Sequence, residues 1–222
     1  MKRLFAVAAA MLLAVSAFAQ FEPTTTWPYI YKDFSAGELQ MPDGSVKKAL
    51  YNIHLGKAKL HFIEGELIRE VNSSDVFAVR IGEDVYANAQ GMILKVLSKS
   101  EKAFIAERME IDEVRLNSTE GAYGSSASTL ATRGLSSLEG IGGTRTNMNH
   151  MELRNSRDDG KILPLNRKVY VVYGTVAVPA TQKDVLDIPE IDKNAVKAFV
   201  KENKIKWKDP VSLQILADYL AK

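Results

Sequence analysis

The sequence contains no cysteine, and this absence removes several classes of protein at once. A chain without thiols has no disulfide scaffold, no cysteine nucleophile, no iron–sulfur cluster and no cysteine-built zinc site. Histidine is also scarce, with 3 residues among 222. Any site that uses imidazole as a metal ligand or as an acid–base group must therefore draw on His54, His61 or His150.

The chain also lacks a strong excess of charge, since 29 Lys and Arg residues face 27 Asp and Glu residues. Such a chain has no basic field that would attract phosphate backbones, so we expect no nucleic-acid partner. The hydrophobic fraction of 46% and the charged fraction of 25% are ordinary for a folded protein. At this length the chain can bury a core without disulfides.

Only one long hydrophobic run is present, the twelve residues Leu4–Val15. Lys2 and Arg3 precede this run, and the small-residue motif of residues 17–19 follows it. The pattern predicts a secretory signal peptide over residues 1–19 and an exported, periplasmic or secreted protein. A membrane anchor is the alternative, but a spanning helix needs about 20 apolar residues. We expect no transmembrane segment after cleavage.

Cleavage at this point changes the charge balance. Because Lys2 and Arg3 leave with the signal peptide, the mature chain keeps 27 basic and 27 acidic side chains. The formal charge of +2 therefore gives no reason to expect an anionic partner.

Residues 20–116 carry the pattern of an antiparallel meander. Short alternating apolar runs are separated by turn signals about 7 to 10 residues apart, and Pro42-Asp43-Gly44 is a strong turn. We expect seven or eight strands here and no long helix. A hairpin is predicted around Gly56-Lys57, with glycine at the first position of a two-residue turn.

Side-chain alternation sets the register of this hairpin. One face would carry three opposed pairs: Tyr51 with Phe62, Ile53 with Leu60, and Leu55 with Ala58. The other face would carry Asn52, His54, Lys59 and His61.

Residues 117–160 are rich in glycine and serine and predict a flexible segment. Residues 161–222 predict a β-hairpin followed by two helices that complete the same domain. Asp192 would cap the first helix, and Asp209 followed by Pro210 would begin the second. Helices of about 11 residues do not persist alone in water, so these must pack on the strands.

The predicted fold class is therefore mainly β. We expect an antiparallel meander that forms an open barrel or sandwich, with two short C-terminal helices packed on it.

The chain carries neither a nucleotide-binding glycine motif nor a serine-hydrolase elbow nor the His-Glu-x-x-His zinc motif. His54 and His61 are the only metal candidates, because the predicted register makes them diagonal neighbours on one face. A metal site needs a third ligand, and Lys59 opposite His54 would repel a cation. The alternative is a pair of solvent-facing histidines. We expect no cofactor.

Three aromatic side chains alternate along the extended segment before the strands: Trp27, Tyr29 and Tyr31. Such a row could stack on a sugar ring and bind a ligand. A row that clamps an edge strand onto the core is favoured, because large aromatic side chains are usually buried.

Several short motifs resemble a group of exported β-rich proteins of Bacteroidetes. They are Tyr31-x-Asp33-Phe34-x-x-Gly37, Pro42-Asp43-Gly44, Leu50-Tyr51-Asn52-Ile53, Ile81-Gly82-x-x-Val85-Tyr86 and the stretch Phe199–Ile205. The resemblance implies an envelope or secreted location. It carries over no catalytic residue.

The sequence thus favours a non-catalytic envelope protein that binds another protein or a surface component. One alternative is a β-barrel that binds a small molecule, either a lipid or a glycan. Another is a metal-dependent hydrolase that uses the His54 and His61 face.

Overall fold

A computed structural model describes residues 24–98, 102–112, 149–155, 157–158 and 162–222. The predicted signal peptide of residues 1–19 and residues 117–148 of the predicted flexible segment lie outside the described residues. Within the described ranges, no helix combines the length and the apolar character that crossing a membrane requires.

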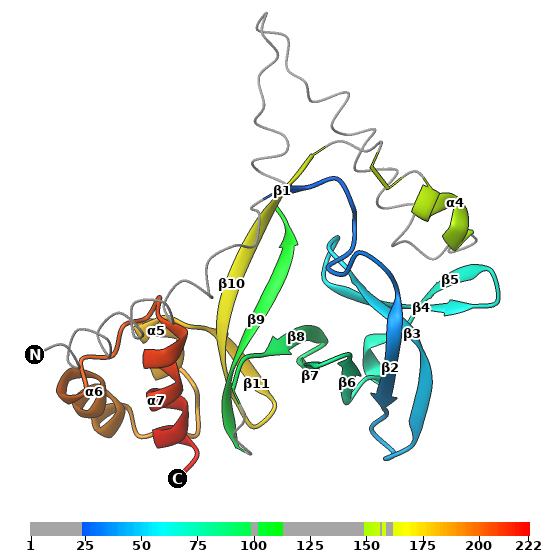
Figure 1. Cartoon of the computed structure of the whole chain (residues 1–222). Coiled ribbons are helices and arrows are strands. Elements are labelled where there is room, and N and C mark those ends of the chain that lie inside the picture. The colour runs from blue at the N-terminus through cyan, green and yellow to red at the C-terminus, as the bar shows by residue number, and fades with distance from the viewer. Residues whose placement is uncertain (1–23, 99–101, 113–148, 156, 159–161) are drawn as a thin grey trace, which may run out of the picture.

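The fold is built on one antiparallel sheet of eleven strands (Figure 1). The strands are β1 Thr24–Thr25, β2 Ser35–Gln40, β3 Val46–His54, β4 Lys59–Glu64, β5 Leu67–Glu70, β6 Ala78–Ile81, β7 Asp84–Ala89, β8 Met92–Val96, β9 Ala103–Ile111, β10 Leu163–Tyr173 and β11 Val176–Pro179. Their order is β1-β10-β9-β8-β7-β6-β2-β3-β4-β5, and β11 pairs with β10. The mainly β prediction is confirmed.

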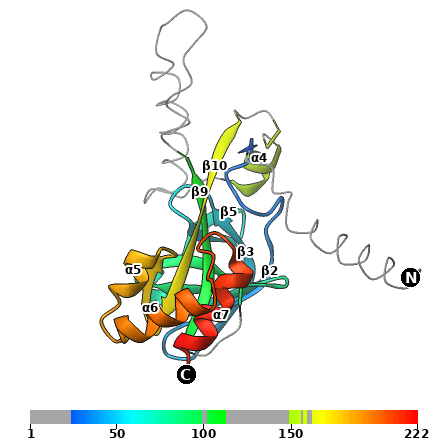
Figure 2. The ribbon, with the colours of Figure 1, turned by 90° about the vertical axis from the view of Figure 1, so that its left-hand side faces the viewer.

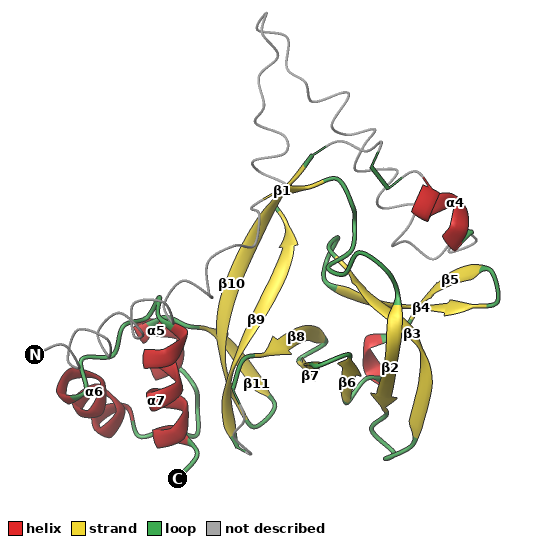
Figure 3. Ribbon diagram, viewed as in Figure 1, coloured by secondary structure: helices red, strands yellow, loops and turns green. Residues whose placement is uncertain are grey.

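Two meanders, β2 to β5 and β6 to β11, share this sheet. They join where β6 pairs with the free edge of β2, with Gly37 opposite Ile81 and Gln40 opposite Ala78. The sheet is strongly curved, with β2 to β5 on one side and β9 to β11 on the other (Figure 3). The two sides touch where the backbone N–H of Ile111 donates to the carbonyl of Leu55 at 3.0 Å.

The predicted register of the β3–β4 hairpin is confirmed, because Tyr51 lies opposite Phe62 and Ile53 opposite Leu60. The predicted turn is wrong. The turn spans residues 55–58, and the residues with positive φ are Lys57 at 66° and Ala58 at 48° rather than Gly56.

Gly56 is needed for a different reason. A Cβ atom at this position would lie 2.9 Å from the Cε1 atom and 3.0 Å from the Nδ1 atom of the His54 ring. Glycine therefore allows the imidazole to fold back against the turn.

Both predicted C-terminal helices are present. They are α6, Lys193–Glu202, and α7, Pro210–Leu220, and their N-caps are Asp192 and Asp209 as expected. Each cap carboxylate accepts backbone N–H groups of the first turn.

The structure adds two short helices, α4 (His150–Asn155) and α5 (Gln182–Leu186), that the apolar pattern did not predict. With six and five residues, they are too short to show a helical repeat in the sequence. The predicted β-hairpin of residues 161–222 is formed by β10, which begins at Leu163, and β11.

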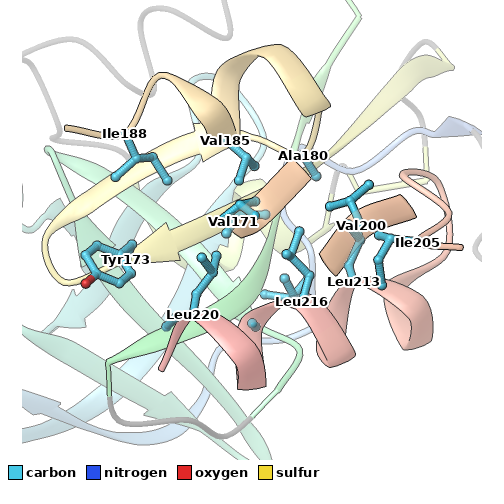
Figure 4. Close-up of a cluster of buried hydrophobic side chains, with 14 of the residues drawn as sticks. Val171, Tyr173, Ala180, Val185, Ile188, Val200, Ile205, Leu213, Leu216 and Leu220 are labelled. Atoms are coloured by element: carbon cyan, nitrogen blue, oxygen red, sulfur yellow. The ribbon is translucent and has the colours of Figure 1, made fainter. Parts of the chain in front are cut away.

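The helices lie on one side of the molecule, where α7 packs against β9 and β10, α5 contacts β11, and α6 contacts α5 (Figures 1 and 2). Figure 4 shows the cluster between them, in which side chains of β10 meet those of the helices. The residues labelled there are Val171, Tyr173, Ala180, Val185, Ile188, Val200, Ile205, Leu213, Leu216 and Leu220. We call this set the helical core.

A second cluster fills the curve of the other half of the sheet. Its buried members come from β2 to β4, β6 to β8 and the segment before β6: Leu39, Tyr51, Ile53, Ala58, Leu60, Val76, Val79, Ile81, Tyr86 and Ile93. The set includes the apolar residues of one predicted hairpin face, together with residues of the neighbouring strands. They place one face of β3 and β4 in the core.

We expect Leu213→Ala to lower the free energy of unfolding by about 2–5 kcal/mol, because this fully buried side chain leaves a cavity in the helical core. Urea unfolding of the full chain measures the change. Ile215→Ala is the matched control, since Ile215 lies on the same helix with 46% of its surface exposed. The control should change stability by no more than about 0.5 kcal/mol. Equal losses in both variants would contradict the proposed packing.

Candidate functional site

The segment before β2 forms a continuation of the sheet beside the end of β3. We call residues 26–34 the lead-in segment. Tyr29 forms an antiparallel bridge with His54. The N–H of Leu55 donates to the carbonyl of Pro28 at 2.8 Å, and the N–H of Ile30 donates to the carbonyl of Ile53 at 2.9 Å. The lead-in segment therefore covers the edge of β3 that β2 is too short to reach.

Asn52 joins the lead-in segment to β3 at the point where regular pairing breaks. Its Oδ1 atom accepts from the backbone N–H of Tyr31 at 3.1 Å and from its neighbour Ile53 at 2.9 Å. Its Nδ2 atom donates to the carbonyls of Tyr31 at 2.8 Å and Asp33 at 3.3 Å. The buried side-chain amide of Asn52 thus provides hydrogen-bond partners for backbone groups that take no part in regular strand pairing.

The bridge between Tyr29 and His54 places Tyr29 on the face that carries both hairpin histidines. The rings of His54 and His61 stack with centroids 5.0 Å apart and planes 18° apart. The Tyr29 ring meets both edge-on, at 5.1 Å and 5.6 Å. Trp27 and Phe34 pack on the Tyr29 ring at 5.4 Å and 4.9 Å. We call Tyr29, His54 and His61 the imidazole cluster.

This arrangement overturns the expectation of solvent-facing histidines. His54 is 1% exposed and His61 is 0% exposed. The physical reason is the lead-in segment, whose aromatic side chains exclude water from the second face of the hairpin.

Hydrogen bonds indicate which nitrogen of each ring accepts and which carries the hydrogen. The N–H of Gly56 donates to Nδ1 of His54 at 3.1 Å, so the ring hydrogen of His54 is on Nε2. The Tyr29 hydroxyl lies 2.9 Å from Nδ1 of His61. On the other side of that ring, a Glu70 carboxylate oxygen lies 3.7 Å from Nε2, which favours the hydrogen there and makes Tyr29 the donor.

The two Nε2 atoms remain unsatisfied. Both are buried and neither has a hydrogen-bond partner among the described residues. The 3.7 Å separation between His61 and Glu70 exceeds hydrogen-bond length. Glu70 instead pairs with Lys59, whose Nζ atom lies 3.1 Å from the carboxylate.

The surroundings shift the ionisation of this cluster. Burial, followed by the neighbouring His61 ring, lowers the pKa of His54 from 6.5 to about 4, while the Gly56 carbonyl and Glu70 oppose the shift. The pKa of Glu70 is lowered chiefly by His61 and also by Lys59, against the effect of burial. Burial raises the pKa of Tyr29. His54 is therefore neutral near pH 7.

The predicted metal pair does come together, but in an unsuitable geometry. Stacked imidazoles direct their in-plane lone pairs side by side rather than toward one point, whereas a metal ion needs converging ligands. Among the described residues, no group of three or more His, Asp or Glu side chains could hold a metal ion.

The three aromatic candidates do not form one platform for a sugar. Trp27 and Tyr29 are buried, which is the packing role that the sequence favoured. Tyr31 turns away to a separate cluster, where its hydroxyl donates to Asp84 at 2.6 Å and lies 2.7 Å from the hydroxyl of Tyr86. Lys95 pairs with the same carboxylate at 2.8 Å.

Two roles in the site were not predicted from the sequence. Asn52 links the lead-in segment to β3, and Glu70 provides the nearest carboxylate. Extending the register across the β4–β5 hairpin would have placed Glu70 opposite His61, as observed. Nothing in the pattern indicates the role of Asn52, because its partners come from a segment without a strand signal.

Comparison of the chain with protein-family models, curated proteins and solved structures gave no match.

We expect Asn52→Ala to lower the free energy of unfolding by about 2–4 kcal/mol, because it leaves backbone groups of the lead-in segment and β3 without partners. Chemical denaturation of the full chain measures the loss. Asn194→Ala provides a control, since Asn194 is exposed on α6. A loss no larger than that of the control would show that Asn52 does not hold the segment.

The pKa of His54 also predicts how stability changes with pH. The unfolded chain binds a proton near pH 6.5, whereas folded His54 does so only near pH 4. Between these values the unfolded state holds more protons, so stability falls as pH falls. The contribution of His54 reaches roughly 3 kcal/mol by pH 4. Urea unfolding from pH 7.5 to pH 4.5 should show a smaller pH dependence for His54→Asn than for His150→Asn. If the free energy of unfolding changed equally with pH in both variants, His54 would not be the group that causes this part of the pH dependence.

Proposed function

We propose that this protein is an exported, non-catalytic interaction module that binds a protein partner through one face of its sheet. We call this the outer face; it comprises the side chains of β2, β3, β6 and β7 that point away from the second cluster. Export is supported by the charged start, apolar run and small-residue motif of residues 1–19.

The exposure of large apolar side chains on the outer face is the observation that carries this proposal. Val46 is 57% exposed and Leu50 is 44% exposed, and Val85 is exposed as well. The residues that follow Leu50 and Val85 in the sequence are Tyr51 and Tyr86. Their side chains point to the opposite face of the sheet and are buried in the second cluster. Apolar groups gathered among polar ones on a surface are typical of a protein-binding site.

The charges on the outer face indicate the chemistry of the partner. Glu38 lies between two cations, 3.1 Å from Lys48 and 2.7 Å from Arg80. Lys48 and Arg80 thus carry two positive charges, whereas Glu38 between them carries one negative charge. A partner surface with apolar side chains beside Asp or Glu would complement it.

The imidazole cluster argues against an enzyme built on His54 and His61. Both rings and Tyr29 are buried, so a substrate cannot reach them without displacement of the lead-in segment. The glycan alternative meets the same obstacle, because Trp27 and Tyr29 offer no exposed ring face.

A binding experiment with matched surface variants tests the proposal. The mature chain is immobilised and exposed to envelope extract, and each captured protein is purified and titrated back by calorimetry. We expect a partner whose affinity falls at least about tenfold in Val46→Ser/Leu50→Ser, because the variant removes apolar contact area. Val211→Ser/Ile215→Ser, which alters exposed apolar residues on α7, should bind as the wild type does.

Two outcomes would overturn the proposal. One is a partner that binds both double variants equally, since the outer face would then not be the interface. The other is turnover of a substrate by the purified chain together with no specific partner.

A further inference from the structure

We propose that the imidazole cluster is an acid-sensitive clasp, in which a proton added to the His54 ring releases the lead-in segment from the β3–β4 hairpin. The inference concerns the end of β3 beyond Leu50, a part of the strand that the proposed binding surface does not use. It rests on the buried stacked rings, their unsatisfied nitrogen atoms and the backbone bonds that join residues 26–30 to the end of β3.

The first step is the addition of the proton itself. The free nitrogen of neutral His54 is Nδ1, which accepts the N–H of Gly56 at 3.1 Å. A proton on Nδ1 would make this atom a donor that faces the N–H donor of Gly56, so the hydrogen bond between them would break. The nearest new acceptor is the carbonyl of Gly56, at 3.4 Å from Nδ1. The other nitrogen, Nε2, is buried and has no hydrogen-bond partner in the part of the chain that the structure describes, so it offers the charge no stabilisation.

The second step is the response of the charged neighbours. Among the described residues, the titratable groups around His54 are its stacked partner His61 on β4, Tyr29 on the lead-in segment, Lys59 on β4 and Glu70 on β5. Glu70 is the one anion among them, and its carboxylate already pairs with Lys59 at 3.1 Å. A charge on His54 would therefore be largely uncompensated, consistent with the lowered pKa of this ring.

The third step is the local character of the release. Tyr29 contacts both imidazoles directly, so the lead-in segment is the element that a charged ring would displace first. Residues 26–30 of the segment are joined to the hairpin by backbone bonds to β3 and belong to no regular strand. The rest of the segment has side-chain anchors of its own, because Tyr31 bonds Asp84 and Asp33 pairs with Arg154. The helical core lies on the far side of the molecule and shares no residue with the imidazole cluster (Figures 1 and 4). Segments with few contacts open before the core does.

The two tryptophans of the chain permit a direct test. Trp27 lies in the lead-in segment against Tyr29, and Trp207 packs against the helical core. Trp207→Phe leaves Trp27 as the sole reporter of the clasp, and Trp27→Phe leaves Trp207 as the reporter of the core. We expect the Trp27 emission to shift to the red with a midpoint between about pH 4 and 6.5, while Trp207 emission stays unchanged in that range.

Three variants in the Trp207→Phe background identify the group that responds. His54→Asn keeps an acceptor in place of Nδ1 but does not titrate, and it should lower the midpoint by at least about one pH unit. His150→Asn alters the histidine outside the cluster and should leave the midpoint unchanged. Glu70→Gln should leave the transition in place or move it to higher pH, because it removes the anion that favours a charged ring.

The proposal is overturned if Trp27 and Trp207 respond at the same pH, because acid would then unfold the whole chain. It is also overturned if Trp27 emission does not change down to pH 4, or if Glu70→Gln abolishes the transition. Should His54→Asn fail to fold, the order of the Trp27 and Trp207 transitions in the two single-tryptophan proteins still decides the matter.

Discussion

The pairing of the lead-in segment with the end of β3 is the interaction on which the rest of this half of the molecule depends. Strand β3 extends beyond β2, and its backbone groups past Tyr51 need partners because unpaired buried groups are costly. The lead-in segment supplies them, and Asn52 satisfies the irregular stretch between the two paired regions. This pairing also brings Tyr29 opposite His54. Without it, the histidine face of the hairpin would lie in water.

One face of β3 changes character along its length as a result. Lys48 and Leu50 are exposed beside β2, whereas Asn52 and His54 on the same face are buried beside the lead-in segment. The exposed part contributes to the outer face and the buried part to the imidazole cluster. A binding surface and a proton-sensitive site can therefore lie on one strand without sharing side chains. The helical core shares no residue with either of them.

Much of the fold followed from local patterns. The β3–β4 register followed from strict alternation, because a slip of one residue would have mixed apolar and polar sets. The caps Asp192 and Asp209 located the helices α6 and α7, because capping depends on residues within one turn. The turn at Gly56 was misassigned because its glycine serves the ring of His54, a contact that turn statistics do not contain. The helices α4 and α5 were missed because they are shorter than two helical turns.

The sequence alone determined that His54 and His61 share a face, because residues on paired strands take their direction from register. It also determined the alternation of Trp27, Tyr29 and Tyr31, but not that Tyr29 joins the histidines while Tyr31 joins Asp84. Only the tertiary structure decided that the histidine face is buried. The reason is that burial depends on which distant segment covers a surface, and the lead-in segment reaches β3 through backbone pairing that leaves no trace in side-chain periodicity.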